Sequence, residues 1–158
     1  MSDVLATVTP SPLRRILGVT VMGTLGVLLV YSALVTAPSF GWRLVLLAFG
    51  GLALAGTVRL WQATQGRVEL TATQLRDSAG TVLAEMDQIV AIDRGMFAFK
   101  PSNGFVLKLA GRHPRGWAPG LWWRTSRRVG IGGVTNAHEA KAMAELLAAR
   151  IAAARRDA

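Results

Sequence analysis

The chain has 158 residues, 51% of them hydrophobic, and its 18 lysines and arginines against 9 acidic residues give a formal net charge of +9. The absence of cysteine excludes disulfide bonds and thiolate chemistry. About 65 residues belong to an apolar N-terminal part, which leaves roughly 90 residues, enough for one small domain.

Two uninterrupted apolar stretches follow a short N-terminal segment, residues 1–15. Residues 17–37 carry no charge, and residues 44–60 are flanked by Trp42 and Trp61, whose rings suit the membrane interface. At a rise of about 1.5 Å per residue, each stretch can cross most or all of a hydrocarbon layer of roughly 30 Å. The sequence therefore predicts a two-helix transmembrane hairpin over residues 16–64.

The charges around the hairpin predict its orientation. Basic residues on the side of the two chain ends are Arg14, Arg15, Arg67 and Arg76, whereas the turn carries Arg43. This bias places both termini in the cytoplasm and the turn between the helices in the periplasm. The alternative interpretation of the first stretch is a signal peptide with small residues at 35–37, but an h-region usually has roughly 7–15 residues.

Small residues in the second stretch allow another helix to approach closely: Gly50, Gly51, Ala55 and Gly56. They pack either against the first helix of the hairpin or against another membrane protein.

Residues 65–158 are expected to form a cytoplasmic domain of short strands. Four segments are predicted to be strands: 67–71, 74–77, 81–85 and 89–94. The first alternates polar and apolar residues, and the last is rich in β-branched residues. A tight hairpin through Asn103-Gly104 is predicted to join 96–100 to 105–110. Residues 111–120, with two prolines and three glycines, read as an irregular basic loop, after which 121–124 and 127–131 resume strand character.

The last predicted element is an amphipathic helix over residues 136–156. Asn136 can cap its first turn, and Glu139 stands three positions later, as in a capping box. One face is apolar at helical spacing and should cover the strands: Ala140, Met143, Ala144, Leu147, Ile151 and Ala154.

These features together resemble the bacterial pleckstrin-homology-like (PH-like) membrane proteins. The hairpin, the opening VELTATQLRDSAGTVLAEMDQIVAIDRG with its edge Ile89-Val90-Ala91-Ile92, and the terminal helix carry the resemblance. It implies an α+β membrane protein in which a small antiparallel PH-like β-barrel or sandwich, capped by the C-terminal helix, follows the hairpin. It also implies a binding or scaffolding role, without naming a ligand.

A strongly basic segment defines the candidate binding residues. Residues 94–138 contain no acidic side chain, and aromatic residues lie among their arginines. Cations and indole rings together suit the phosphate-rich surface of a membrane. The predicted lipid-binding or partner-binding residues are Arg112, Arg115, Trp117, Trp122, Trp123, Arg124, Arg127 and Arg128. On a regular strand, Trp122 and Trp123 must point to opposite faces.

Residues suited to catalysis are few and scattered. His113 and His138 have no companion at a metal-binding spacing, and the carboxylates Glu85, Asp87 and Asp93 stand near predicted turns and strand ends. The glycines at 130–133 lack the ending of a phosphate-binding loop and favour a strand-to-helix turn. The sequence therefore predicts no catalytic residue, metal or cofactor.

The expected function is that of a non-enzymatic accessory, scaffold or assembly protein of the inner membrane. Its basic domain would dock on a membrane protein complex, on anionic phospholipid headgroups, or on both. One alternative is a membrane-tethered nucleic-acid-binding module that uses the same arginines, although no recognition motif accompanies them. The other is a small membrane-bound enzyme that uses Asp87, Asp93 or His113.

Overall fold

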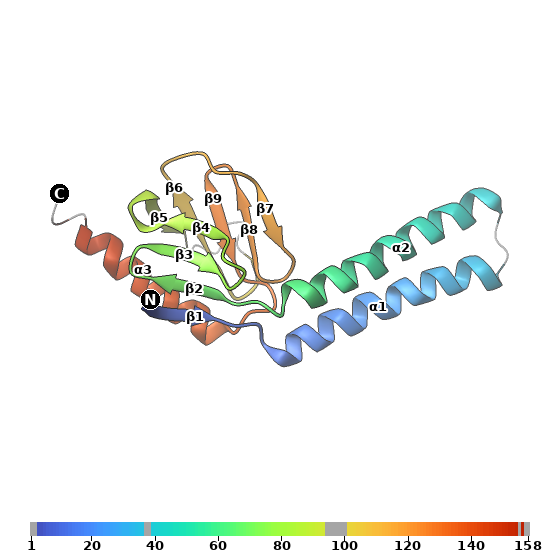
Figure 1. Cartoon of the computed structure of the whole chain (residues 1–158). Helices are drawn as coiled ribbons and strands as arrows, with labels where there is room; N and C mark the ends of the chain where they lie inside the picture. Colours follow the sequence, from blue (N-terminus) through green and yellow to red (C-terminus); the bar gives the residue numbers. More distant parts are fainter. Residues whose placement is uncertain (1–2, 37–38, 94–100, 155, 157–158) are drawn as a thin grey trace.

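Two long helices, α1 (Pro12–Val35) and α2 (Phe40–Ala63), form a hairpin that projects from the rest of the molecule (Figure 1). The computed structural model describes residues 3–36, 39–93, 101–154 and 156. Each helix has 24 residues and is long and apolar enough to cross a membrane. Their most apolar windows are only 11% and 6% buried, unlike the core helix of a soluble protein.

Glycines bring the two helices into close contact. A Cβ atom on Gly50 would lie 2.7 Å from Val30 Cγ2 and 3.1 Å from the Gly26 carbonyl oxygen. A Cβ atom on Gly56 would lie 2.7 Å from Met22 Cε, whereas one on Gly51 would meet nothing within 4 Å. Packing within the hairpin is thus confirmed for Gly50 and Gly56, and Gly51 lies on its outer side.

The first sheet has the order β1-β2-β3-β4, with all neighbours antiparallel. Its strands are β1 (Val4–Val8), β2 (Val68–Thr71), β3 (Gln74–Asp77) and β4 (Val82–Glu85). The last three were predicted, but β1 was not. Because β1 precedes the hairpin and β2 follows it, their pairing, with Val8 opposite Val68, joins the N-terminal segment to the domain expected at 65–158.

The second sheet has the order β5-β6-β9-β8-β7 and follows a short 3-10 turn, η1 (Met86–Gln88). Its strands are β5 (Ile89–Asp93), β6 (Phe105–Leu109), β7 (Gly116–Ala118), β8 (Trp122–Thr125) and β9 (Arg128–Ile131). The loop predicted at 111–120 is wrong in part, because β7 pairs there with β8, Trp117 standing opposite Trp123. The predicted strand 96–100 lies outside the described residues.

The turn before β6 needs two of its residues for different reasons. Asn103 adopts the left-handed conformation, with φ at 53°, whereas Gly104 does not, so the positive φ angles predicted for the Asn-Gly pair are confirmed at Asn103 only. Gly104 is required by close approach, because a Cβ atom there would collide with the Ile131 carbonyl oxygen of β9.

The two sheets and α3 (Ala137–Ala154) enclose one hydrophobic core. The largest fully buried side chains include Phe105, Leu70, Leu75, Leu107 and Leu147. Among the described strands the sheets remain separate, so the barrel version of the expected fold is wrong and the sandwich version fits. Helix α3 contacts β1 in one sheet and β5 and β6 in the other, and so packs against both sheets.

The start of α3 is fixed by two polar side chains. The Asn136 Oδ1 atom accepts the His138 backbone N–H at 3.1 Å, which confirms the predicted cap. Glu139 does not complete the capping box: its Oε2 atom accepts the Thr9 backbone N–H at 2.6 Å and the Thr9 hydroxyl at 2.7 Å. The carboxylate therefore binds the helix to the segment that links β1 to α1.

The apolar face predicted for α3 packs on the core through its first half. Ala140, Met143, Ala144 and Leu147 are buried, and Ile151 packs partly against the same core. Ala154, at the helix end, is exposed.

Candidate functional site

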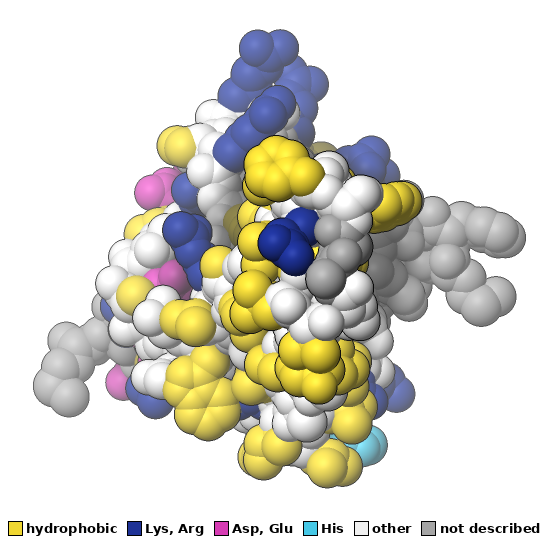
Figure 2. Space-filling model, turned by 90° about the vertical axis from the view of Figure 1, so that its right-hand side faces the viewer, with side chains coloured by type: hydrophobic (Ala, Val, Ile, Leu, Met, Phe, Trp, Pro, Cys, Tyr) yellow, Lys and Arg dark blue, Asp and Glu magenta, His cyan; other side chains and the backbone are white. Residues whose placement is uncertain are grey.

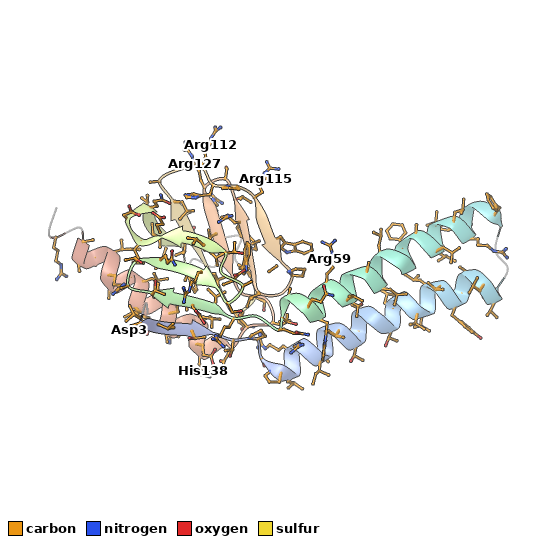
Figure 3. The ribbon with its side chains drawn as sticks, viewed as in Figure 1. Asp3, Arg59, Arg112, Arg115, Arg127 and His138 are labelled. Atoms are coloured by element: carbon orange, nitrogen blue, oxygen red, sulfur yellow. The ribbon has the colours of Figure 1, made fainter. Side chains whose placement is uncertain are left out.

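Four of the predicted arginines are exposed where strands of the second sheet begin or end, on one side of that sheet. Arg112 and Arg115 lie in the connection before β7, and Arg127 and Arg128 lie at the turn from β8 to β9. The His113 backbone N–H donates to the Ser126 carbonyl at 2.7 Å and holds the two segments together. Figure 3 labels Arg112, Arg115 and Arg127 on this side, and Figure 2 shows lysine and arginine side chains gathered at the same side. We call these four arginines the basic edge.

The positive charge of the basic edge is not neutralised by the described part of the chain. The ion pairs found there join Arg67 and Arg76 to Glu69, Lys108 to Asp93, and Lys141 to Glu145. None of them includes an arginine of the basic edge. The four guanidinium groups are thus placed to attract an external anion.

Arg124, also predicted as a binding residue, turns inward. Its Nε atom donates to the Pro114 carbonyl at 2.7 Å, and its Nη1 atom donates to the Val82 carbonyl at 2.6 Å. The side chain therefore ties β8 to β4 of the other sheet and fixes the segment that carries Arg115. The two-residue period of a strand could have predicted this inward orientation, because Arg124 and Trp122 share a face of β8 and Trp122 is buried.

The three candidate tryptophans occupy different environments. Trp122 is 6% exposed and packs in the core, whereas Trp123 points to the opposite face, as predicted, and its ring lies across Gly130. Trp117 stands opposite Trp123 on β7 and is 70% exposed. Of the three rings, Trp117 is the one that projects freely from the sheet.

Strand β7, which carries Trp117, contacts the domain end of the hairpin, whereas the basic edge lies at the other end of the β7–β8 pair. Strand β7 contacts α2, and a Cβ atom on Gly120, just after β7, would lie 2.8 Å from Leu60 Cδ1. Figure 3 shows Arg59 projecting from α2 toward the same side as Arg115. Trp117 thus stands on the strand that leads from the basic edge to α2.

At the domain end of the hairpin, an arginine of α1 contacts a tryptophan of α2. The Arg15 guanidinium carbon lies 3.9 Å from the centroid of the Trp61 ring, and its Nη2 atom donates to the Trp61 carbonyl at 3.3 Å. A cation over an indole face is an attractive arrangement. Sequence reasoning placed both residues near the membrane interface but missed this contact, because no local pattern links residues on two helices.

The groups considered for catalysis are dispersed. Asp93 faces Lys108 at 3.9 Å, Asp87 is exposed in η1, and His138 is exposed on the first turn of α3. In the described ranges no three histidine, aspartate or glutamate side chains could hold a metal ion together. The backbone amides of Gly132 and Gly133 donate to the Leu121 and Ser102 carbonyls, so this loop does not present them to an anion.

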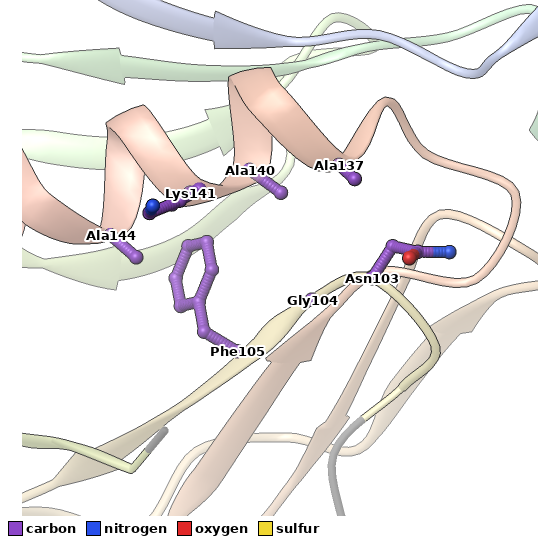
Figure 4. A pocket seen from close by; sticks show the side chains of 7 residues that line it. All are labelled: Asn103, Gly104, Phe105, Ala137, Ala140, Lys141 and Ala144. Atoms are coloured by element: carbon purple, nitrogen blue, oxygen red, sulfur yellow. The ribbon is translucent and has the colours of Figure 1, made fainter. Parts of the chain in front are cut away.

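A cavity of ≈ 330 Å³ lies between α3 and the turn before β6 (Figure 4). Phe105 and three alanines of α3 form most of its described wall, and Lys141 is the charged residue among them. This wall offers neither a carboxylate nor a histidine for acid–base chemistry.

No protein-family model, curated protein or solved structure matches this chain. Its class is therefore defined by its own architecture, two apolar helices followed by two antiparallel sheets and a C-terminal helix. The resemblance to the bacterial PH-like membrane proteins stays a prediction.

Proposed function

We propose that this protein is a non-enzymatic accessory module of the bacterial inner membrane, whose hairpin spans the bilayer and whose basic edge binds anionic phospholipid headgroups. The observation that carries the proposal is that four exposed arginines without ion pairs among the described residues gather on one side of the domain, the side toward which Arg59 of α2 also projects. If α2 spans the bilayer, this surface lies within reach of the headgroups.

The strength of the attraction follows from the charges. An anionic leaflet attracts roughly 1 kcal/mol per nearby lysine or arginine, within a Debye length of about 8–10 Å. The four arginines of the basic edge are exposed and lack internal ion pairs among the described residues. Trp117 adds an indole ring, which favours the interface between lipid and water.

The pairing of β1 with β2 supports the orientation. These strands precede and follow the hairpin, so both hairpin ends belong to one domain. Since the basic residues flanking the hairpin cluster at the same ends, we assign this side to the cytoplasm, where the leaflet is anionic.

The absence of cysteine allows a direct experiment, because a single cysteine can be labelled selectively. The full chain carrying Trp117→Cys, labelled with a polarity-sensitive dye, is reconstituted in nanodiscs of phosphatidylcholine with or without phosphatidylglycerol. We expect phosphatidylglycerol to shift the dye emission to the blue, more at low salt than at high salt.

The matched variants test the basic edge itself. Arg115→Gln with Arg127→Gln should abolish most of the shift, whereas Lys141→Gln with Arg156→Gln, which removes the same charge from exposed positions at α3, should preserve it. Equal emission in both lipids would contradict the proposal. Loss of a co-purifying acidic membrane complex in the Arg115/Arg127 variant, without any lipid response, would reassign the edge to a protein partner.

A further inference from the structure

The outer face of the second sheet carries a pair of tryptophans. Trp117 of β7 and Trp123 of β8 stand directly opposite each other, so their rings share one face of the sheet. This face points away from the core, because Trp122, the neighbour of Trp123, is buried. Trp117 is 70% exposed and Trp123 is partly exposed. Both rings are therefore accessible from outside the molecule.

The Trp123 ring lies flat on the sheet. A Cβ atom on Gly130 of β9 would stand 2.2 Å from its Cε2 atom, 2.4 Å from Nε1 and 2.5 Å from Cζ2. Cε2 is the carbon at the ring junction, and it is nearer than either of the edge atoms bonded to it, so Gly130 lies under the face of the indole. Any side chain at this position would push the ring away. Glycine thus lets the indole rest on the backbone with its opposite face turned outward.

Two exposed arginines occupy the next row of the same face. Arg128 of β9 is two residues from Gly130, so its side chain leaves the sheet on the side of the tryptophans. The register of β7 and β8, continued by one residue, places Arg115 opposite Thr125, which is the cross-strand partner of Arg128. Neither arginine has an ion pair among the described residues. The face therefore presents a row of rings beside a row of cations.

The combination of rings and cations selects the chemistry of a ligand. Aromatic bases stack on an open indole face, and guanidinium groups bind phosphate oxygens. A phospholipid headgroup offers phosphate but no aromatic ring, and a neutral sugar offers a ring but no charge. Lys108, the other neighbour of Arg128, is opposed by Asp93 at 3.9 Å, so the two arginines supply the net charge of this face. A single-stranded nucleic acid offers phosphates at a regular spacing and bases that are free to stack, unlike those of a duplex.

We propose that the outer face of the second sheet binds single-stranded nucleic acid. One base stacks on the Trp123 ring and a neighbouring base on Trp117, while Arg115 and Arg128 bind the phosphates between them. This site goes beyond the proposed function and does not rest on it, because it needs no anionic lipid. The two arginines also belong to the basic edge, so a nucleic acid and an anionic leaflet compete for them.

The test uses the full chain in phosphatidylcholine nanodiscs and a short fluorescein-labelled oligouridylate, with anisotropy as the measure of binding. At low salt we expect the single strand to bind at least tenfold more tightly than duplex RNA of the same length. Trp117→Leu keeps an apolar side chain but removes the ring, and should weaken binding by about five- to a hundredfold. Trp117→Phe, which keeps an aromatic ring, should retain most of the affinity. Trp42→Leu, at the far end of the hairpin, should retain all of it.

The phosphate contacts are tested separately through salt. Arg128→Gln should weaken binding and reduce the slope of log affinity against log salt by about 0.7, the value for one phosphate contact on a single strand. Lys141→Gln, on exposed α3, should change neither quantity.

Three results would overturn the assignment: no binding of the oligouridylate at low salt, equal affinity for the single strand and the duplex, or full affinity in the Trp117→Leu variant. Weaker RNA binding in nanodiscs that contain phosphatidylglycerol would support a shared use of the two arginines. If the labelled Trp117→Cys protein responds to phosphatidylglycerol and no RNA binds, the proposed function stands and this site is wrong. The two hypotheses therefore fail separately.

Discussion

Arg124 illustrates how one residue of the basic segment differs from its neighbours. Its guanidinium group binds the Val82 and Pro114 carbonyls across two sheets, whereas the Arg127 side chain is exposed. Hydrogen bonds to a charged group contribute about 1.5–3 kcal/mol. We expect Arg124→Gln to lower the free energy of unfolding by that amount and Arg127→Gln to change it by less than about 0.5 kcal/mol. Denaturant unfolding of the full chain in detergent measures both, and equal effects would contradict the structural role of Arg124.

Glu69 makes the stability of the domain depend on pH. Its carboxylate accepts hydrogen bonds from Arg67 at 2.8 Å and Arg76 at 3.2 Å. The bond from Arg67 is the largest cause that lowers the pKa of the Glu69 carboxyl; burial opposes it, and Arg76 adds to it. Because the pKa is lower in the folded protein, this stabilisation is complete above the ordinary glutamate pKa and is lost as the pH falls through the lowered value.

We therefore expect the Tm of the wild-type protein to fall between about pH 6 and pH 3 more steeply than that of Glu69→Gln. At neutral pH the variant should be the less stable of the two, since it loses the charge-assisted bonds. Thermal scans across this range decide the point, with Glu145→Gln on exposed α3 as the control. Parallel curves for wild type and Glu69→Gln would show that Glu69 does not set the acid response.

At the scale of elements, β1 tests whether the N-terminal segment belongs to the domain. Val8 is fully buried and pairs with Val68, while Val4, on the same strand, is 45% exposed. An unpaired charge at the buried position should cost more than about 3 kcal/mol. Val8→Asp is thus expected either to abolish the cooperative unfolding transition, because the domain no longer folds, or to lower its Tm sharply. Val4→Asp should be tolerated. A folded, equally stable Val8→Asp variant would show that β1 is dispensable.

Helix α3 allows a similar comparison between its two faces. Leu147 is fully buried, whereas Ala149 is exposed. Truncation of a buried leucine alone costs about 2–5 kcal/mol, and a carboxylate adds a desolvation penalty. Leu147→Asp should therefore abolish the cooperative unfolding transition that Ala149→Asp retains. Equal tolerance of the two substitutions would mean that α3 does not pack on the sheets.

The elements that the sequence predicted are those with a local signal. Runs of apolar residues define α1 and α2, the cap at Asn136 defines the start of α3, and β-branched residues mark β5. Strand β1 lacks such a signal, because its partner β2 lies beyond the whole hairpin. Strand β7 was hidden by neighbouring prolines and glycines, and it exists because β8 offers an edge to pair with.

The candidate site was predictable in composition and less so in geometry. The acid-free segment indicated Arg112, Arg115 and Arg127. These residues lie in loops and turns, where the exposure of a side chain depends little on the register of the strands. The hydrogen bonds that Arg124 makes to the other sheet depend on how the two sheets meet. Such contacts between distant segments carry no periodic pattern in one sequence.

For the molecule as a whole, the pairing of β1 with β2 constrains topology more strongly than charge does. Both strands belong to one sheet, so the residues before α1 and after α2 must lie on the same side of any membrane that the hairpin crosses. The distribution of arginines then selects the cytoplasmic side. We expect a reporter that is active only after export to stay silent when fused before Met1 or after Ala158, and to become active when inserted after Ser39, between the helices.

Two outcomes of the reporter experiment would contradict the predicted topology in different ways. Activity at both chain ends with silence at Ser39 would reverse the orientation and remove the anionic leaflet from the basic edge, while leaving the β1–β2 pairing intact. Activity at one chain end alone would place the ends on opposite sides, which the pairing of Val8 with Val68 forbids. To separate that result from a misfolded fusion, the same reporters are placed on the Val8→Asp variant, in which the sheet no longer ties the N-terminal segment to the domain. If the sheet helps to hold both ends in the cytoplasm, the N-terminal fusion should gain activity in that variant more than the C-terminal fusion, because Arg67 and Arg76 still retain the latter.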